Sequence, residues 1–247
     1  MSRIAARHFP LIVLLTATLT WASSVIGSAE KPEAAPAKTR YSATAISTTD
    51  VFAGTLKTTS GMEPESAFWK INLRTGTTSS IELPAELRDR EIVGILPAKQ
   101  GVYVISQYTI EQGDQPLVHH FDTGPGRWKR VGQVDCPAFS VIHSSKKDLT
   151  FECEELDESG KTMPKKKSLA LLKQFPVTAR DLKIPQTQDA AASREVRLQG
   201  TPFEWDSLKV RLDKKEKTYD ASALTTAHES QTKAPAPRAQ SGTSQKR

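Results

Sequence analysis

The sequence has few of the residues and motifs that catalysis or metal binding requires. Its 247 residues include only two cysteines and five histidines, and these lack the close spacing that zinc ligands usually have. No nucleophile elbow, phosphate-binding loop, dinucleotide-binding fingerprint or H-E-x-x-H pair occurs. We therefore predict no catalytic residue, no metal site and no cofactor.

Two of the histidines are adjacent. His119 and His120 fall on a predicted strand, where neighbouring side chains point to opposite faces, so both cannot bind one metal ion. One of them could still combine with His143 and with Glu152 or Glu154. The competing interpretation, which we favour, is that these are ordinary strand histidines.

The excess of positive charge lies at the ends of the chain. The formal net charge is +6, of which residues 1–29 carry +2, residues 30–40 carry +1 and residues 221–247 carry +3. The remaining part, 41–220, is neutral overall. Because a nucleic-acid-binding domain needs its basic residues clustered on the folded part, we expect no nucleic-acid partner.

The N-terminal residues have the pattern of an export signal. Arg3 and Arg7 precede an apolar run, and Gly27-Ser28-Ala29 offers a small-residue cleavage site, so residues 1–29 are predicted to be a signal peptide. This predicts a periplasmic or secreted protein of a bacterium. The alternative is an uncleaved single-pass inner-membrane anchor, because residues 9–27 are nearly long enough to span a bilayer.

Both flanks of the neutral part look non-globular. Residues 30–40 form an Ala/Pro/Lys linker, and residues 221–247 form a basic Ser/Thr/Ala/Pro/Lys tail without periodicity, which we predict to be disordered. The folded domain is therefore predicted to span residues 41–220.

The two cysteines are predicted to form a disulfide. Export places them in an oxidising compartment, where such a pair is normally bonded. They flank a predicted hairpin; if Ser144 and Ser145 form a two-residue loop, His143 faces Lys146 and the same register brings Cys136 opposite Cys153.

The middle of the chain repeats a β pattern. Residues 67–83 are echoed by residues 117–131, with Gly76 aligned to Gly124 at a separation of 48, and residues 92–105 are echoed by residues 139–152. A period of this size is typical of four-stranded propeller blades. We predict an all-β fold of antiparallel meander repeats of about 47 residues, a small or incomplete β-propeller, with a β-sandwich as the alternative.

The predicted blades follow the chain in order. The first uses residues 41–83, the second residues 91–131 and the third residues 139–184, while residues 195–212 supply an incomplete fourth. The turn Ile71-Asn72-Leu73-Arg74-Thr75-Gly76, with its echo Phe121-Asp122-Thr123-Gly124, resembles the outer-strand turn of kelch-like and quinoprotein-like propeller blades. The resemblance covers residues 67–184 and implies a structural class, with no site residue attached.

Two sets of residues are candidates for binding. Trp69 and Trp128 have no counterpart at the repeat spacing, so they either line a ligand surface or fill irregular gaps in the core. The lysines of two predicted loops of the third blade form either a basic rim or a solvated charge run. They are Lys146, Lys147, Lys165, Lys166 and Lys167.

The function that these patterns predict is binding. We expect an exported, non-enzymatic binding or scaffold protein of the bacterial envelope that engages a protein or glycan through its blade loops. One alternative is an exported polysaccharide hydrolase or lyase, which would need at least two carboxylates converging in a pocket. The other is a membrane-anchored accessory subunit of an envelope complex, which follows if the signal is uncleaved.

Overall fold

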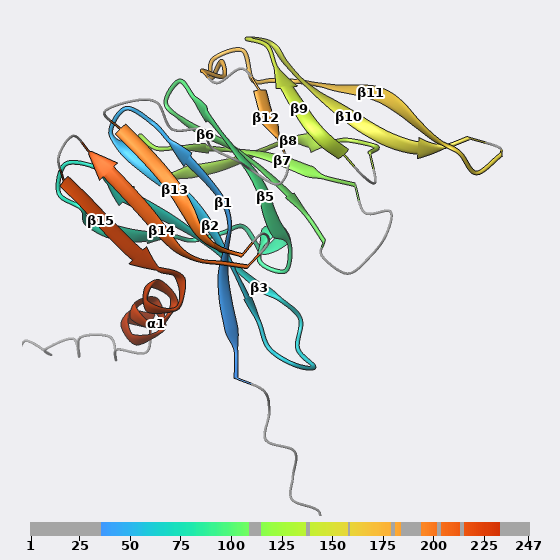
Figure 1. Cartoon of the computed structure of the whole chain (residues 1–247). Helices are drawn as coiled ribbons and strands as arrows, with labels where there is room; N and C mark the ends of the chain where they lie inside the picture. Colours follow the sequence, from blue (N-terminus) through green and yellow to red (C-terminus); the bar gives the residue numbers. More distant parts are fainter. Residues whose placement is uncertain are drawn as a thin grey trace, which may run out of the picture. The chain divides into compact units, whose positions relative to one another are not determined.

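The computed structural model describes residues 36–108, 115–136, 139–157, 159–178, 181–183, 194–201, 204–212 and 215–232. In this part the chain is all-β, with antiparallel sheets and one short helix (Figure 1). The predicted signal peptide, residues 1–29, lies outside the described residues.

The largest sheet, sheet A, contains the first four strands and the last three. Its order is β13-β14-β1-β2-β3-β4, and β15 also pairs with β14. The strands are β1 (Lys38–Ile46), β2 (Asp50–Thr58), β3 (Glu65–Asn72), β4 (Thr78–Ile81), β13 (Arg194–Thr201), β14 (Glu204–Leu212) and β15 (Lys215–Asp220). The first four strands form the meander that the sequence predicts, and the segments predicted as an incomplete fourth blade add to the same sheet.

Sheet B is a meander of four strands, as predicted for residues 91–131. Its order is β5-β6-β7-β8. The strands are β5 (Glu91–Ala98), β6 (Gly101–Gln107), β7 (Leu117–Asp122) and β8 (Arg127–Gln133). A short 3-10 helix, Ala85–Leu87, connects sheet A to it.

Sheet C departs from the predicted meander. Its order is β11-β10-β9-β12, so the fourth strand pairs with β9 and not with β11. The strands are β9 (Phe139–Ser144), β10 (Asp148–Leu156), β11 (Thr162–Ala170) and β12 (Asp181–Lys183). The physical reason is the path of residues 171–178, which cross to sheet B and form an isolated bridge between Ala98 and Val177.

The sheets stack face to face, and each interface is apolar. Phe52 and Phe68 of sheet A pack in one cluster with Ile95 and Val104 of sheet B. The opposite face of sheet B packs on sheet C through a second cluster. Strands β1 and β2 are buried over most of their length because they are covered on both faces.

A third apolar cluster accounts for the position of the last strands. Tyr41 and Trp69, on the face of sheet A away from sheet B, pack with Leu208 and Tyr219 of β14 and β15 and with Leu224 of the helix α1 (Ala221–Thr232). The three C-terminal strands and α1 therefore cover a face that would otherwise be exposed. They join sheet A through the pair Tyr41–Trp205.

No closed propeller or barrel is found in the described part of the chain. Closure would require the free face of sheet C to pack on another sheet. That face is polar. The Glu152 carboxylate lies 3.0 Å from the His143 ring and 3.4 Å from the Lys166 ammonium group, and the hydroxyls of Thr150 and Ser168 are hydrogen-bonded to each other. The outer face of sheet A is already covered by the C-terminal strands and α1. Because the outer face of sheet C is polar, the stack has no exposed apolar face that ring closure would need to bury.

The ends of the folded part differ from the prediction. The linker predicted for residues 30–40 overlaps β1, which begins at Lys38 and carries Arg40 in a largely buried ion pair with Glu91 at 2.8 Å. The tail predicted to be disordered from Ala221 begins with α1, whose Ala223 N–H bonds the Asp220 carboxylate as a helix cap. The remainder of that tail, residues 233–247, lies outside the described residues.

The repeat is present, but its alignment shifts by two residues. Gly76 and Gly126 both have φ of 67°, in turns where Asn72 and Asp122 accept hydrogen bonds from the main-chain N–H two residues later. Gly124 has no such conformation. The equivalent of Gly76 is therefore Gly126, because only the residue that adopts positive φ needs to be glycine.

Candidate functional site

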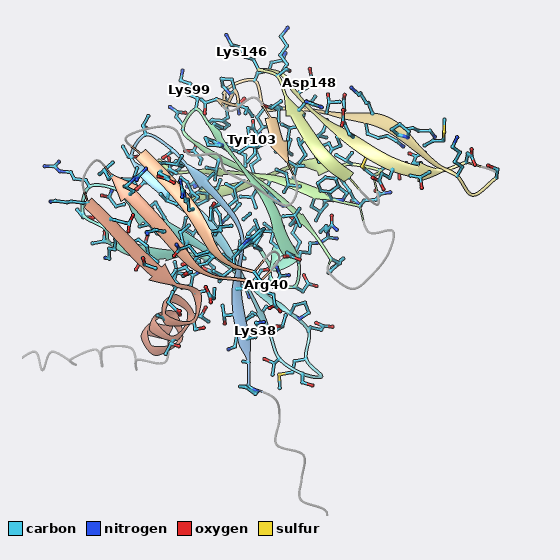
Figure 2. The ribbon with its side chains drawn as sticks, viewed as in Figure 1. Lys38, Arg40, Lys99, Tyr103, Lys146 and Asp148 are labelled. Atoms are coloured by element: carbon cyan, nitrogen blue, oxygen red, sulfur yellow. A yellow bond between two sulfur atoms is a disulfide. The ribbon has the colours of Figure 1, made fainter. Side chains whose placement is uncertain are left out.

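A large hollow in the described part of the chain lies where turns from all three sheets meet. It has a volume of about 1280 Å³. Its lining comes from the β1–β2 turn (46–48), the β5–β6 turn (97–100), the β9–β10 turn (144–146) and the crossing segment 176–178. We call it the three-turn hollow. Figure 2 shows that Lys99 and Lys146 point outward at this same end of the fold, whereas Lys38 and Arg40 lie at the opposite end.

Two of the turns are built alike. In the first, the Ser47 N–H bonds the Asp50 carbonyl at 2.8 Å and the Asp50 N–H bonds the Ser47 hydroxyl at 3.0 Å. Ser145 and Asp148 make the same two bonds at 2.8 and 2.9 Å. Serine fits this position because its hydroxyl can satisfy the main chain of its own turn.

The third turn is tighter. Ala98 pairs with Gly101, so Lys99 and Gln100 form a two-residue loop, in which Gln100 has φ of 63°. A side chain on Gly101, whose φ is 145°, would collide with the carbonyl of Phe121. This glycine lets the turn lie directly against β7.

Main-chain hydrogen bonds hold the crossing segment against two of the turns. The Lys99 N–H bonds the Pro176 carbonyl at 2.9 Å, and the Thr178 N–H bonds the Pro97 carbonyl at 2.8 Å. The Leu171 N–H bonds the Lys147 carbonyl at 2.6 Å. The hollow is therefore preformed by the fold, and its floor consists of partly or fully buried apolar residues. These are Ile46, Pro97, Ala98, Pro176 and Val177.

The charge of the hollow is positive. Of the described residues, Lys99 and Lys146 belong to its lining and no carboxylate does, and neither lysine makes an ion pair with another described residue. Lys147 follows in the exposed part of the same turn, and Asp148 ends that turn. This end of the stack thus presents the ammonium groups of Lys99, Lys146 and Lys147, while Asp50 and Asp148 each end one of its turns.

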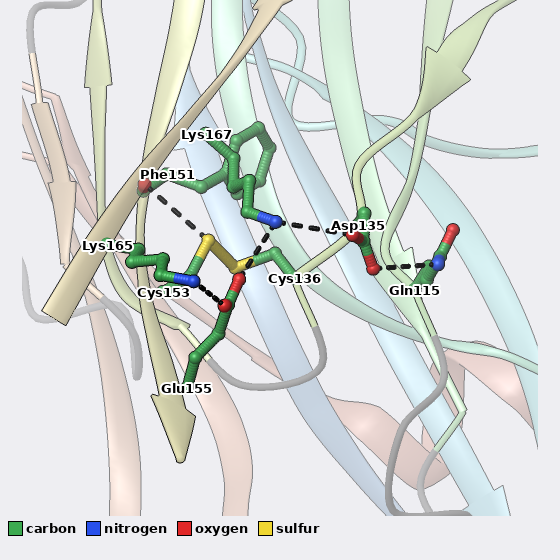
Figure 3. The surroundings of a disulfide bond; sticks show 8 residues. All are labelled: Gln115, Asp135, Cys136, Phe151, Cys153, Glu155, Lys165 and Lys167. Carbon is green, nitrogen blue, oxygen red and sulfur yellow. Dashed lines mark hydrogen bonds and ion pairs between the residues drawn. A yellow bond between two sulfur atoms is a disulfide. The ribbon is translucent and has the colours of Figure 1, made fainter. Parts of the chain in front are cut away.

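The other predicted lysines lie elsewhere and are neutralised. Lys165, Lys166 and Lys167 lie on β11 and not on a loop. Lys165 and Lys167 pair with Glu155, at 2.5 and 2.8 Å, and Lys167 also reaches Asp135 at 3.2 Å (Figure 3). Hydrogen bonds from Lys165 and Lys167 lower the pKa of Glu155, and those to Glu155 and Asp135 raise the pKa of Lys167. The structure therefore does not join these lysines to Lys146 and Lys147 in one rim.

The disulfide lies beside this ion-pair group (Figure 3). Cys136 and Cys153 are bonded, with 5.4 Å between their Cα atoms, which confirms the predicted pairing. The predicted register is wrong: Thr150 pairs with His143, and Cys153 pairs with Phe139. The cause is the four-residue turn from Ser145 to Asp148, which replaces the two-residue loop and leaves Cys136 on the segment before β9.

Both candidate tryptophans pack against core residues. Trp69 is 3% exposed, and its indole N–H donates to the Thr55 hydroxyl at 2.9 Å. Trp128 packs on Phe68 and Phe121 at ring-centre distances of 5.4 and 4.9 Å, and its N–H donates to the Glu82 carbonyl at 2.8 Å. Trp69 is thus a core residue, and Trp128 is partly buried against the core.

The adjacent histidines are buried on opposite faces of β7. His119 lies 2.7 Å from Glu86, and burial lowers its pKa. His120 stacks on Phe175 at 4.0 Å, and burial lowers its pKa to about 4. Within the described ranges, no three His, Cys, Asp or Glu side chains are grouped to hold a metal ion.

Two further hollows lie in the described part of the chain. An apolar groove of about 1070 Å³ is lined by residues 71–76, by Val210 and Leu212 of β14, and by residues of β15; Thr48 and Thr49 also border it. A polar pocket of about 160 Å³ contains Glu195 and Glu216, but Arg197 and Arg211 pair with the first and Lys209 pairs with the second. Carboxylates engaged by cations in this way do not form the open pair that faces a substrate in a polysaccharide hydrolase.

The fold and the site define an all-β protein of stacked antiparallel sheets, and its disulfide indicates an oxidising compartment. No helix among the described residues is long and apolar enough to cross a membrane. No known family model matches the sequence, and a comparison with curated proteins found no significant match.

Sequence reasoning missed Lys99 as a site residue. The signal was the short segment Pro97-Ala98-Lys99-Gln100-Gly101, which occupies the place in its sheet that residues 47–50 and 145–148 occupy in theirs. Aligning turns rather than strands would have grouped Lys99 with Lys146.

Proposed function

We propose that this chain is an exported, non-enzymatic binding protein of the bacterial envelope that engages a protein or glycan partner through the three-turn hollow. The observation that carries the proposal is the convergence of one turn from each sheet on a single preformed hollow. In this proposal sheets A, B and C act as blade-like units, and the three turns act as their binding loops, since function commonly lies on loops held by a rigid scaffold.

The lining of the hollow supports binding over catalysis. A polysaccharide hydrolase or lyase would use two carboxylates that face one another across the substrate. The hollow contributes none from the described residues, and the two carboxylates that share the small polar pocket are each paired with cations. A concave, preformed surface with an apolar floor and charged rim suits recognition of a partner.

A bulky substitution at the edge of the hollow tests the proposal. Thr48 is exposed in the β1–β2 turn, so Thr48→Trp would obstruct the hollow with little effect on the core. Because Thr48 also borders the apolar groove, the matched control is Arg74→Trp, at an exposed position that lines the groove but not the hollow. The exported chain and both variants are immobilised and exposed to envelope extract, and captured proteins and glycans are quantified. We expect the control to retain the captured partner and Thr48→Trp to lose it.

Two results would contradict this role. Equal capture by Thr48→Trp and Arg74→Trp would show that the three-turn hollow does not bind the partner. Shortening of envelope polysaccharide during incubation with the purified chain would favour the enzyme instead. Thermal unfolding followed by circular dichroism establishes that both variants are folded.

A further inference from the structure

The three-turn hollow has features that select among partners. We infer that its ligand is an acidic polypeptide segment that places an apolar side chain on the floor and carboxylates against Lys99 and Lys146. This inference rests on the proposed function, because it names the partner of the same site.

The charges of the rim select an anion. Lys99 comes from sheet B and Lys146 from sheet C, and both line the hollow without an ion pair to any described residue. On β11, by contrast, Lys165, Lys166 and Lys167 lie within 3.4 Å of carboxylates. Lys99 and Lys146 thus lack the ion pairs that neutralise the β11 lysines, so the positive charge at the hollow attracts negative charge and favours carboxylate partners.

The floor of the hollow selects an apolar group. Ile46 and Pro97 are only partly buried, as are Ala98 and Pro176 beside the buried Val177. A ligand that covered this floor with polar groups alone would remove those groups from water without giving them hydrogen-bond partners. An aliphatic or aromatic side chain would instead remove apolar surface from water, at roughly 25 cal/mol per Å².

The hydroxyl groups of the hollow favour a polypeptide over a glycan. The hydroxyls of Ser47 and Ser145 already accept bonds from their own turns, and the Thr178 hydroxyl donates to the Pro97 carbonyl at 3.0 Å. Among the described lining residues there is no aromatic side chain on which a sugar ring could stack. A glycan, which is rich in hydroxyls and has no large apolar groups, finds few matching groups in this part of the fold.

Three labelled probes distinguish these chemistries by fluorescence anisotropy. The first is a peptide that alternates pairs of glutamate with single leucines, the second has serine in place of each leucine, and the third is polygalacturonate. Each is titrated into the wild-type chain, into Lys99→Glu/Lys146→Glu, and into the control Lys129→Glu/Lys161→Glu. The control changes net charge equally, at exposed lysines of β8 and of the β10–β11 turn.

We expect the leucine peptide to bind the wild type and the control with similar affinity. The hollow variant should bind it at least about tenfold more weakly, as reversing two charges at an interface predicts. The serine peptide should also bind the wild type at least about tenfold more weakly than the leucine peptide does, because it lacks the buried apolar group.

Other outcomes overturn the inference. Equal affinity for the leucine and serine peptides would show simple attraction of anions, and tighter binding of polygalacturonate would assign the hollow to a glycan. Equal weakening in both double variants would trace the affinity to net charge alone. If Thr48→Trp still abolishes capture from extract in any of these cases, the binding role stands and only the partner's chemistry fails.

Discussion

The Tyr41 hydroxyl donates a hydrogen bond to the main-chain carbonyl of Tyr219 at 3.2 Å, and it thereby ties the first strand of the chain to the last. Tyr41 is fully buried, so Tyr41→Phe should lower the free energy of unfolding by about 1–2 kcal/mol. Tyr219→Phe, whose own hydroxyl bonds the Gly76 carbonyl in a partly exposed place, should cost less. Urea unfolding checks this order, and an equal or reversed effect would contradict it.

Two glycines provide a test of how tightly the sheets stack. A methyl group on Gly54 would lie 2.9 Å from Cβ of Ile92 and 3.0 Å from the Ser42 hydroxyl, whereas one on Gly132 would meet the end of the Leu169 side chain. Gly54→Ala should destabilise the fold by about 1–3 kcal/mol, because Cβ of Ile92 cannot move without its strand. Gly132→Ala should cost less, since Leu169 can change rotamer. Thermal unfolding of the two variants measures both effects. A larger destabilisation by Gly132→Ala than by Gly54→Ala would contradict this packing.

The disulfide should make a measurable contribution to stability. It closes a loop with a sequence separation of 17 residues between the segment after β8 and β10. A loop of this size predicts a stabilisation of about 3 kcal/mol on the chain-entropy model. Denaturant unfolding of the oxidised chain and of Cys136→Ala/Cys153→Ala measures the difference. Identical unfolding midpoints would mean that the packing of sheets B and C does not depend on the bond.

Stability should fall in mild acid because of His120. Burial lowers the pKa of His120 to about 4, from 6.5 in an accessible histidine. The unfolded chain therefore binds the proton first as the pH falls. The free energy of unfolding should be highest above pH 6.5 and should decrease by up to about 3 kcal/mol as the pH approaches 4.

A variant separates His120 from the other groups that titrate in this range. His120→Phe keeps an aromatic ring against Phe175 and should flatten the pH dependence of the unfolding free energy. His119, whose pKa burial also lowers, leaves a residual slope. His143→Gln, a change at a half-exposed position of sheet C, is the control and should leave most of the slope in place. A slope unchanged by His120→Phe would assign it to other residues.

The order of the strands up to Gln133 could be predicted from local pattern, whereas the way in which the later strands pair could not. Residues such as Phe52 and Val51 alternate between two apolar interfaces, and turns such as Asn72 to Gly76 contain the residues that their geometry needs. Side-chain alternation and turn residues are both patterns of neighbouring residues, so they can be recognised in the sequence. The crossing of residues 171–178 to sheet B has no such local signal, because it depends on main-chain bonds to Pro97 and Lys99.

The candidate site shows the same division. Lys146 and Lys147 were found from composition, but so were Lys165, Lys166 and Lys167, and only the structure separates the first group from the second. The difference is the pairing of β10 with β11, which sets Lys167 and Lys165 beside Glu155. A run of charged residues has the same sequence pattern whether or not residues of a neighbouring strand neutralise it.

By itself, the sequence determined the all-β class, the first two meanders and the disulfide partners, since alternation, turn residues and a lone pair of cysteines are local or unambiguous properties. Only the tertiary structure decided that the sheets stack without closing and that Lys99 joins Lys146 at one hollow. The reason is that a strand with two apolar faces can pack against any apolar layer. Which layer it meets depends on segments far away in the chain, such as β13–β15 and α1, that cover one face first.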